Sequence, residues 1–356
     1  MRQALDVVVI GAGQAGLAMG YYLSRLGLRF VLLEASSAIG QVWRDRYDSL
    51  TLFTPSQYNN LPGMPFPKAR DLYPTKDEVA DYLVAYAARF ELPVRCDAPV
   101  SRMTRTETGY RIEAGGEVFE ARQVVVATGA FQRPYVPPLG ASLSPEVFQL
   151  HSVNYRNPAQ LPPGDVLVVG AGNSGAQIAE ELSATRKVYL SIGRRDRYLP
   201  QRFLGREIFW WLDVVGFLEF PRDTWIGKWL RRRDVQFFTD IPRLVRENGL
   251  ELLGRTTSVE QDEISFADGR RLSVKNVVWA TGFQPDYGWL ELPIFDERGR
   301  PLHQRGVTSA EGLYFLGLPW QYRRSSALIG GVGRDAEFLA QRIEEYLGLA
   351  AERVSS

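Results

Sequence analysis

The sequence predicts an α/β protein built from two Rossmann-like dinucleotide-binding domains, with the second domain inserted into the first. A glycine-rich segment occurs twice: residues 6–23 read DVVVIGAGQAGLAMGYYL and residues 165–182 read DVLVVGAGNSGAQIAEEL. A second repeated pair follows in the same order, VVVATGA at 124–130 and VVWATGF at 277–283. The chain has 356 residues, more than one hydrophobic core usually serves.

Each glycine-rich segment reads as a strand followed by a helix. An acidic residue precedes four apolar positions, which is typical of a buried parallel strand, and a helical pattern follows the glycines. In the first helix, Leu23 and Leu26 lie at helical spacing and Gly27 is a natural stop. In the second helix, Ile178 and Leu182 lie four residues apart on one face. Strands that alternate with helices predict doubly wound parallel sheets.

The chain continues for about 70 residues after the second ATG segment, and the simplest interpretation is a nested layout. Hairpins are expected at 110–121, around Gly115-Gly116, and at 262–274, around Asp268-Gly269, because these dipeptides favour tight turns between apolar alternations. The stretch 158–164 reads as a linker into the second domain. We expect the first domain over 1–157, the second over 165–276, and the segment 277–356 to complete the first.

The glycine pattern G-x-G-x-x-G predicts a site for the pyrophosphate of a dinucleotide. The first glycine makes the tight turn, the second lets the backbone approach the pyrophosphate, and the third lets helix and strand pack closely. The helix N-terminus attracts the phosphate charge. One such match is weak evidence, whereas two, each between a strand and a helix, indicate two sites. The glycines concerned are Gly11, Gly13, Gly16, Gly170, Gly172 and Gly175.

The two sites differ in charge at the position that meets the adenosine ribose. Glu34 ends the strand at 30–33, and a carboxylate there accepts hydrogen bonds from ribose hydroxyls and repels a 2′-phosphate. The same spacing in the second domain reaches Gly193, which is followed by Arg194 and Arg195. Guanidinium groups suit a phosphate, although arginines in a solvated loop are the plain alternative. The first site therefore suits FAD and the second NADPH.

Composition narrows the class of protein. The formal net charge of +1 argues against a nucleic-acid partner. Cys96 is the single cysteine, so the chain lacks the redox-active pair of a thioredoxin-reductase-like enzyme. With only His151 and His303 in addition, we do not expect the usual metal site of Cys and His ligands. Neither a signal peptide nor a run of about 18 apolar residues is visible, so we expect a cytoplasmic protein without a membrane span.

The repeated motifs resemble those of the class B flavoprotein monooxygenases, especially the short soluble bacterial flavin-containing monooxygenases. Further matching stretches are GQVWR at 40–44, LFTPSQYNNLPGMPFP at 52–67, YPTK at 73–76 and GLYFLGLPWQYRRSSALIGGVG at 312–333. The resemblance covers nearly the whole chain.

The motif that identifies this family, F-x-G-x-x-x-H-[ST]-x-x-[FY], is half kept. His151, Ser152 and Tyr155 are present at the right spacing, while Pro145 and Val147 stand where Phe and Gly are expected. The resemblance places this segment at the link between the domains, which argues against His151 as a general base.

The resemblance implies that NADPH reduces FAD and that O₂ adds to the reduced flavin to give a C4a-hydroperoxide. The substrate, a soft nucleophile such as a sulfide or an amine, then takes one oxygen atom. Two alternatives stay open: an NADPH oxidase or flavin reductase without oxygen transfer, and a redox-sensing, transport-accessory flavoprotein. The sequence does not name the substrate, because loops shape such pockets.

The resemblance also implies individual roles. Asn59 and Asn60 are expected near the flavin ring as catalytic residues, with a plain Asn turn as the alternative. An aromatic segment at 207–230 could be a core helix, a homodimer face, a substrate-channel lid or a membrane-surface helix, the first two being favoured. The cofactor contacts implied in addition to those above are Gln14, Ala15, Gln41, Trp43, Arg44, Val100, Thr128, Gly129, Asn173, Ser174, Thr281, Gly282 and Gly317.

Overall fold

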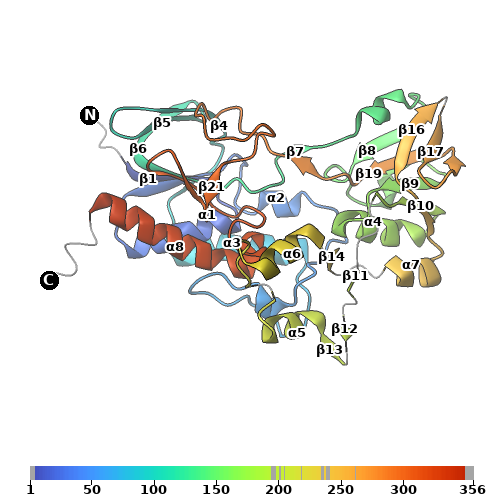
Figure 1. Ribbon diagram of the computed structural model, residues 1–356, viewed down its shortest axis with the longest axis horizontal. Coiled ribbons are helices and arrows are strands. Elements are labelled where there is room, and N and C mark those ends of the chain that lie inside the picture. Colours follow the sequence, from blue (N-terminus) through green and yellow to red (C-terminus); the bar gives the residue numbers. More distant parts are fainter. Residues whose placement is uncertain are drawn as a thin grey trace.

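The computed structural model places the two predicted domains side by side (Figure 1). The described residues are 5–193, 198–199, 202–203, 205–217, 219–233, 236–237, 241–260 and 262–348. No helix within these ranges is both long enough and apolar enough to span a membrane.

The first domain is a nine-stranded mixed sheet around a parallel centre. Its main strand order is β21-β22-β23-β6-β1-β2-β3. The strands are β1 (Leu5–Ile10), β2 (Phe30–Leu33), β3 (Val94–Arg95), β4 (Val100–Arg105), β5 (Tyr110–Ala114), β6 (Glu117–Val126), β21 (His303–Gln304), β22 (Val307–Thr308) and β23 (Leu313–Phe315). The predicted hairpin is confirmed, because Ala114 pairs with Glu117 across Gly115-Gly116.

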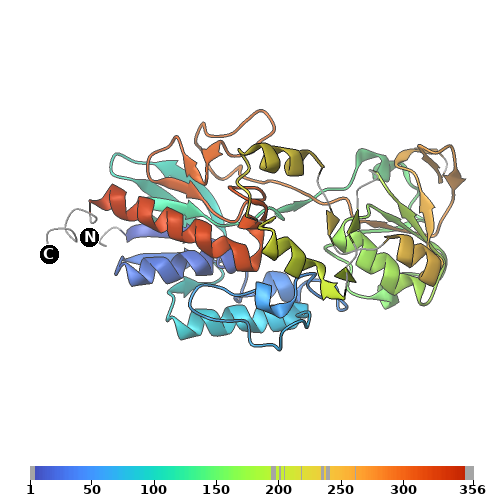
Figure 2. The ribbon, with the colours of Figure 1, turned by 60° about the horizontal axis from the view of Figure 1, so that its bottom comes forward.

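The C-terminal segment completes this domain, as the nested layout predicts. Strand β23 pairs in parallel with β6, although almost 190 residues separate them along the chain. Helix α8 (Ile329–Leu347) then lies beside α1 (Gln14–Arg25), which Figure 2 shows as the red and blue helices. The N-terminal and C-terminal parts of the chain therefore share one core.

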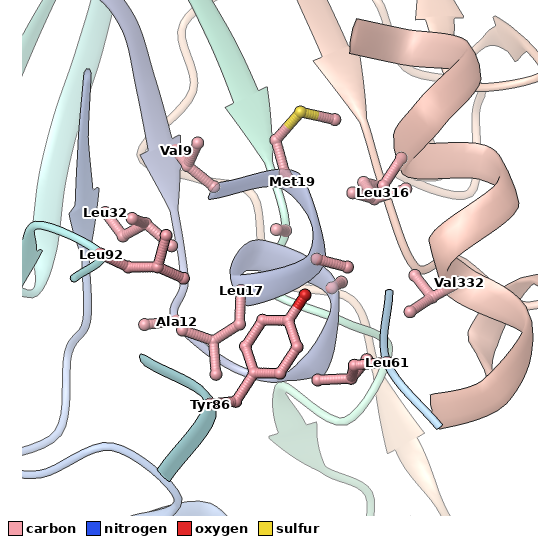
Figure 3. Close-up of a cluster of buried hydrophobic side chains, with 14 of the residues drawn as sticks. Val9, Ala12, Leu17, Met19, Leu32, Leu61, Tyr86, Leu92, Leu316 and Val332 are labelled. Carbon is pink, nitrogen blue, oxygen red and sulfur yellow. The ribbon is translucent and has the colours of Figure 1, made fainter. Parts of the chain in front are cut away.

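Three helices cover one face of the first sheet. Helix α3 (Lys76–Arg89) begins at a capping box, in which Thr75 and Glu78 satisfy each other's backbone amides. The buried side chains of α1, α3 and α8 form one apolar cluster with the central strands, and Figure 3 shows Leu17, Leu32 and Val332 within it. The hairpin β4–β5 and residues 287–295 cover the opposite face.

The second domain repeats this plan on a smaller scale. Its five-stranded parallel sheet has the order β15-β10-β9-β19-β8. The strands are β8 (Phe148–His151), β9 (Val166–Val169), β10 (Val188–Ser191), β15 (Glu251–Leu253) and β19 (Asn276–Trp279). Helices α4 (Asn173–Ser183) and α7 (Ile241–Asn248) pack on one face. The meander β16 (Thr256–Glu260), β17 (Glu263–Phe266) and β18 (Arg271–Leu272) covers the other, as the second predicted hairpin requires.

The sheet membership differs from the domain boundaries drawn from the sequence. Strand β8 lies within the range 1–157 assigned to the first domain, yet it pairs with β19 at the edge of the second sheet. Strand β19 extends to Trp279, past the expected end of the second domain at 276. The second domain therefore begins before the linker at 158–164, because β8 completes its sheet.

Two antiparallel linker strands form what we call the domain junction. Strand β7 (Arg133–Pro134) leads out of the first domain and pairs with β20 (Phe283–Gln284), which leads back. Strand β20 begins immediately after Gly282 of the second ATG segment, and β7 begins four residues after Gly129 of the first, so the two crossings start from similar places in the two repeats.

The aromatic segment at 207–230 lies between β10 and α7 of the second domain in the sequence, but it packs on the first domain. Helix α5 (Ile208–Val214) packs against the first domain, and Phe209 stacks on Phe53 at 6.3 Å between ring centroids. Beyond it, Glu219 accepts hydrogen bonds from Arg323, at 2.7 Å, and from Ser325, at 3.0 Å.

The two helices of this segment differ in burial. The core-helix alternative fits α5, whereas in α6 (Trp225–Arg233) the Trp225 side chain is 78% exposed. A homodimer face stays a prediction.

The remaining elements are α2 (Gln41–Arg44), η1 (Ser56–Tyr58), η2 (Pro138–Ser142), η3 (Pro158–Gln160), η4 (Arg324–Ala327), β11 (Tyr198–Leu199), β12 (Arg202–Phe203), β13 (Arg206–Glu207) and β14 (Gln236–Phe237).

Candidate dinucleotide sites

The first glycine loop has the geometry that a pyrophosphate site requires. Gly11 adopts a φ of +101°, which disfavours other residues, and a Cβ on it would lie 2.7 Å from the carbonyl oxygen of Ala127. A Cβ on Gly16 would lie 1.9 Å from the Gly11 carbonyl oxygen, so helix and strand meet there without room for a side chain. At Gly13 a Cβ would meet nothing within 4 Å. The open space at the second glycine is where a ligand would approach the backbone.

Helix α1 begins beside this open space with its amides available. Its N-cap is Gly13, which has no side chain to accept from the first turn, and that turn contains no acidic residue. Gln14 and Ala15 are its first residues, and a Cβ on Gly317 would lie 2.8 Å from the Ala15 Cβ. The end of β23 therefore lies against the helix N-terminus, which brings these three predicted contacts together.

The carboxylate of Glu34 is already oriented by backbone amides. The amide of Ala12 donates to one oxygen at 2.9 Å and the amide of Ser36 donates to the other at 3.0 Å. The Ala98 amide donates to the Glu34 carbonyl at 2.9 Å, which places Val100 two residues further along the neighbouring segment. Glu34 thus lies at the end of β2, next to the glycine loop, as the spacing predicts.

Residues 41–44 form α2 and contact the segments around it. Arg44 forms an ion pair with Asp81 of α3 at 2.5 Å, and the Gln41 carboxamide donates to Asp45 at 2.9 Å. Trp43 packs partly buried against the core of the first domain. Contact of these side chains with FAD stays a prediction.

The two asparagines expected near the flavin are engaged within their own loop. Asn59 is buried, donates to the carbonyls of Thr54 and Pro55 at 2.9 Å each, and accepts from the Thr54 hydroxyl at 2.6 Å. Asn60 is exposed and accepts from the Phe66 amide at 2.8 Å. Both side chains stabilise the loop through hydrogen bonds, which is the structural role expected of a plain Asn turn. A catalytic role for either asparagine stays a prediction.

The second glycine loop repeats the geometry of the first. Gly170 has a φ of +105°, and a Cβ on it would lie 2.4 Å from the Ala280 carbonyl oxygen. A Cβ on Gly175 would lie 2.0 Å from the Gly170 carbonyl oxygen. The two loops therefore exclude side chains at the same two positions and for the same steric reason.

Helix α4 presents a second free N-terminus. Gly172 is its N-cap, without a side-chain cap, and the first turn, which begins with Asn173 and Ser174, has no acidic residue. Tyr47 of the first domain reaches this helix, and its hydroxyl donates to the Gln177 carboxamide oxygen at 2.8 Å. The second pyrophosphate site is thus next to a segment of the first domain.

The two ATG segments end in glycines with open surroundings. Gly129 and Gly282 have φ of +69° and +82°, and a Cβ on either would meet nothing within 4 Å. The hydroxyl of Thr128 accepts from Gln132 at 2.8 Å, and the hydroxyl of Thr281 donates to the backbone carbonyl of Tyr135, the residue after β7. This geometry permits the close cofactor approach expected at these positions.

The hydrogen bonds between strands correct one equivalence inferred from spacing. In each repeat, the amide of the first motif glycine donates to the last residue of the neighbouring strand, Leu33 or Ser191. The residue equivalent to Glu34 is therefore Ile192, not Gly193, because the second repeat is one residue shorter between glycine and strand end. The conclusion that the second site lacks the carboxylate is unchanged.

A cation that the spacing did not identify lies beside this position. A Cβ on Gly193 would lie 3.8 Å from the Arg255 Nε atom. By strand pairing, Arg255 occupies the place that Asp97 has in the first domain, so the charge is inverted there. Arg194 and Arg195 lie outside the described residues. Arg255 follows β15, whereas Arg194 and Arg195 follow β10. Only an alignment of strand register between the two repeats could have identified Arg255 from the sequence.

The half-kept motif links the second sheet to the junction. The His151 ring nitrogen Nε2 lies 3.0 Å from the Gly282 carbonyl oxygen, and burial lowers the pKa of His151. Tyr155 is buried and donates to Glu181 of α4 at 2.7 Å. These contacts give both residues a structural role at the place the resemblance implies.

Two nucleotide sites on paired Rossmann domains define a dinucleotide-dependent oxidoreductase. Residues 8–198 match the family model described as pyridine nucleotide-disulphide oxidoreductase, and the chain belongs to this family. Because it has one cysteine, it lacks an internal pair for disulfide exchange.

Known proteins are similar over almost the full length. The CzcO-like oxidoreductase of Geobacillus kaustophilus is 50% identical and aligns over 96% of this chain and 99% of its own. The indole-3-pyruvate monooxygenase YUCCA4 of Oryza sativa is 29% identical over 96% of this chain and 87% of its own. The solved flavin-containing monooxygenase of Stenotrophomonas maltophilia is 29% identical, covers 97% of this chain and 99% of its own, and has a TM-score of 0.81. The protein is therefore a flavin-dependent oxidoreductase with the flavin monooxygenase fold, comprising an FAD domain and an NADP domain.

Proposed function

We propose that the protein is an FAD- and NADPH-dependent monooxygenase that transfers one oxygen atom of O₂ to a soft nucleophile, such as a sulfide or an amine. The observation that carries the proposal is the pair of dinucleotide sites with opposite charge, Glu34 at the first and Arg255 beside the second. The likeness to a flavin-containing monooxygenase supports oxygen transfer as the reaction.

The residues present fit the two cofactors. The open backbone at Gly13 and the amides of α1 suit the FAD pyrophosphate, and Glu34 suits ribose hydroxyls while repelling a 2′-phosphate. The N-terminus of α4 suits the second pyrophosphate, and Arg255 suits the 2′-phosphate of NADPH. When bound, the cofactors supply the hydride and the oxygen activation.

The overall reaction balances without a protein nucleophile. NADPH and one proton provide two electrons, one oxygen atom goes to the substrate, and the other leaves as water. The protein's residues bind and orient the cofactors and exclude water. His151 fits a positioning role better than proton transfer, because its ring contacts the Gly282 carbonyl and burial favours its neutral form.

The test is oxygen transfer measured directly. FAD-loaded protein with NADPH under ¹⁸O₂ is offered thioethers, tertiary amines and a 2-oxo acid, the last because one relative is an indole-3-pyruvate monooxygenase. We expect substrate to accelerate NADPH consumption and the label to enter a sulfoxide or N-oxide. Hydrogen peroxide equal to the NADPH consumed, with no labelled product, would show an oxidase. Failure of NADPH to reduce the flavin would favour a sensing role.

A further inference from the structure

Arg46 lies at the domain junction, between the two chain crossings. Its guanidinium carbon is 5.5 Å from the ring centroid of Phe283 and 5.8 Å from that of Phe131. The two rings meet edge to face at 5.3 Å. Phe131 follows the first ATG segment and Phe283 follows the second. A single cation thus touches the aromatic side chains at both crossings.

The Arg46 guanidinium has no close ion pair in the part of the chain that the structure describes, although the Asp45 carboxylate attracts it from a longer distance. Among the described residues, no carboxylate lies within 4.0 Å of its guanidinium, and no hydrogen bond from it to protein is found. The neighbouring Arg156, in contrast, is 3.8 Å from Asp45 and donates to the Val153 carbonyl at 3.4 Å. Burial is the main cause that lowers the pKa of Arg46. A partly buried, unpaired cation costs free energy, which a bound anion would offset.

The adjacent residue, Tyr47, indicates which ligand would carry that anion. Tyr47 contacts Gln177 in helix α4, whose free N-terminus is the second pyrophosphate site. Gln177 in turn donates to the carbonyl of Thr51 at 3.2 Å, so this segment of the first domain is fastened to the helix. Arg46 thus contacts the domain junction, while the next residue, Tyr47, contacts the helix at the phosphate-binding end of the NADP domain.

We propose that Arg46 binds the diphosphate of the nicotinamide nucleotide at the domain junction and so ties the nucleotide to both domains. A guanidinium can rest its face on aromatic rings while its edge donates to phosphate oxygens. The inference rests on the proposed function, since it takes NADPH as the second nucleotide. An anionic substrate is the other ligand that could offer this guanidinium a negatively charged group, through its carboxylate.

The role proposed for Arg46 differs measurably from that of Arg255. The diphosphate is common to NADPH and NADH, whereas the 2′-phosphate belongs to NADPH alone. Loss of Arg46 should therefore weaken both nucleotides by the same factor, and loss of Arg255 should weaken only NADPH.

The experiment uses calorimetric titration of FAD-loaded protein with NADP⁺ and with NAD⁺. We expect Arg46→Gln to raise the dissociation constant of both about 10- to 100-fold, the effect of one charge-assisted hydrogen-bonding group. Arg46→Lys keeps the charge and should lose less. The matched control is Arg156→Gln, which removes a nearby but already paired arginine and should leave both constants within about twofold.

Three outcomes would overturn the proposal. In the first, Arg46→Gln binds both nucleotides as the wild type does. In the second, only NADP⁺ is weakened. In the third, nucleotide binding is unchanged while KM rises for an anionic thioether and not for its neutral analogue, which would assign Arg46 to the substrate. FAD content and thermal unfolding show whether each variant is folded, and Arg46→Lys decides if the glutamine variant is not. None of these titrations requires oxygen transfer, so they stay informative if the monooxygenase reaction fails.

Discussion

Two glycines of the first loop should respond in opposite ways to the addition of one methyl group. A Cβ on Gly13 would meet nothing within 4 Å, and its φ of −74° is accessible to any residue. A Cβ on Gly16 would lie 1.9 Å from the Gly11 carbonyl oxygen. We therefore expect Gly13→Ala to impair FAD binding with little effect on the apoprotein, and Gly16→Ala to impair folding itself.

The magnitudes follow from these distances. In Gly13→Ala the methyl group occupies the space through which phosphate would approach the amides of α1, and losing one charge-assisted hydrogen bond costs about 1.5–3 kcal/mol, or roughly 10- to 150-fold in FAD affinity. The apoprotein loses a glycine N-cap, which costs less than about 1 kcal/mol. In Gly16→Ala, helix and strand must separate by more than an ångström, which places the cost at or above the upper end of about 1–3 kcal/mol for overpacking.

The assay pairs two measurements on each variant. Urea unfolding of the apoprotein gives the free energy of unfolding, and equilibrium dialysis gives the FAD dissociation constant. Gly175→Ala in the second domain is the matched variant, because its Cβ would lie 2.0 Å from the Gly170 carbonyl oxygen. If Gly13→Ala retained FAD like the wild type, or destabilised the apoprotein as much as Gly16→Ala, our assignment of the open space to a ligand would be wrong.

Three further predictions concern charged groups. Glu34→Gln replaces one of two acceptors by a donor, so FAD affinity measured by dialysis should fall by about 1.5–3 kcal/mol, and unchanged retention would contradict the ribose role. Arg255→Ala should lower NADPH affinity roughly tenfold and leave NADH affinity unchanged; an equal loss for both nucleotides would place this side chain away from the 2′-phosphate. Burial, with Arg222, lowers the pKa of His303 from 6.5 to about 4, and the unfolded chain therefore takes up the proton first as pH falls. The free energy of unfolding should decrease between about pH 6.5 and pH 4 by at most about 1.4 kcal/mol per pH unit, and His303→Phe should flatten that profile in urea titrations at several pH values.

The local elements were predictable because their signals are local. The glycine loops predicted both β-α turns, the turn dipeptides at 115–116 and 268–269 predicted both hairpins, and Glu34 lies where its spacing places it. The length of chain beyond the second ATG segment predicted the nested layout, and β23 in that stretch pairs with β6 of the first sheet.

Pairing across long distances was not predictable in the same way. Strand β8 precedes the linker and yet belongs to the second sheet, where it pairs with β19. More than a hundred residues separate the two strands, so no local pattern indicates this pairing. Spacing also misplaced the equivalent of Glu34 by one residue, since a loop one residue shorter in the second repeat leaves no mark in the glycine pattern. Strand register is set by hydrogen bonds between segments, which a single segment does not encode.

By itself, the sequence determined the two dinucleotide loops, their order and the absence of a redox cysteine pair, since each depends on residue identity within a short window. Only the tertiary structure decided which side chains meet: Arg255 beside Gly193, Arg46 over Phe131 and Phe283, and the Asn59 carboxamide engaged within its own loop. The physical reason is that a backbone turn follows from local conformational preference. The partner of a charge or of a buried amide depends instead on how distant elements pack.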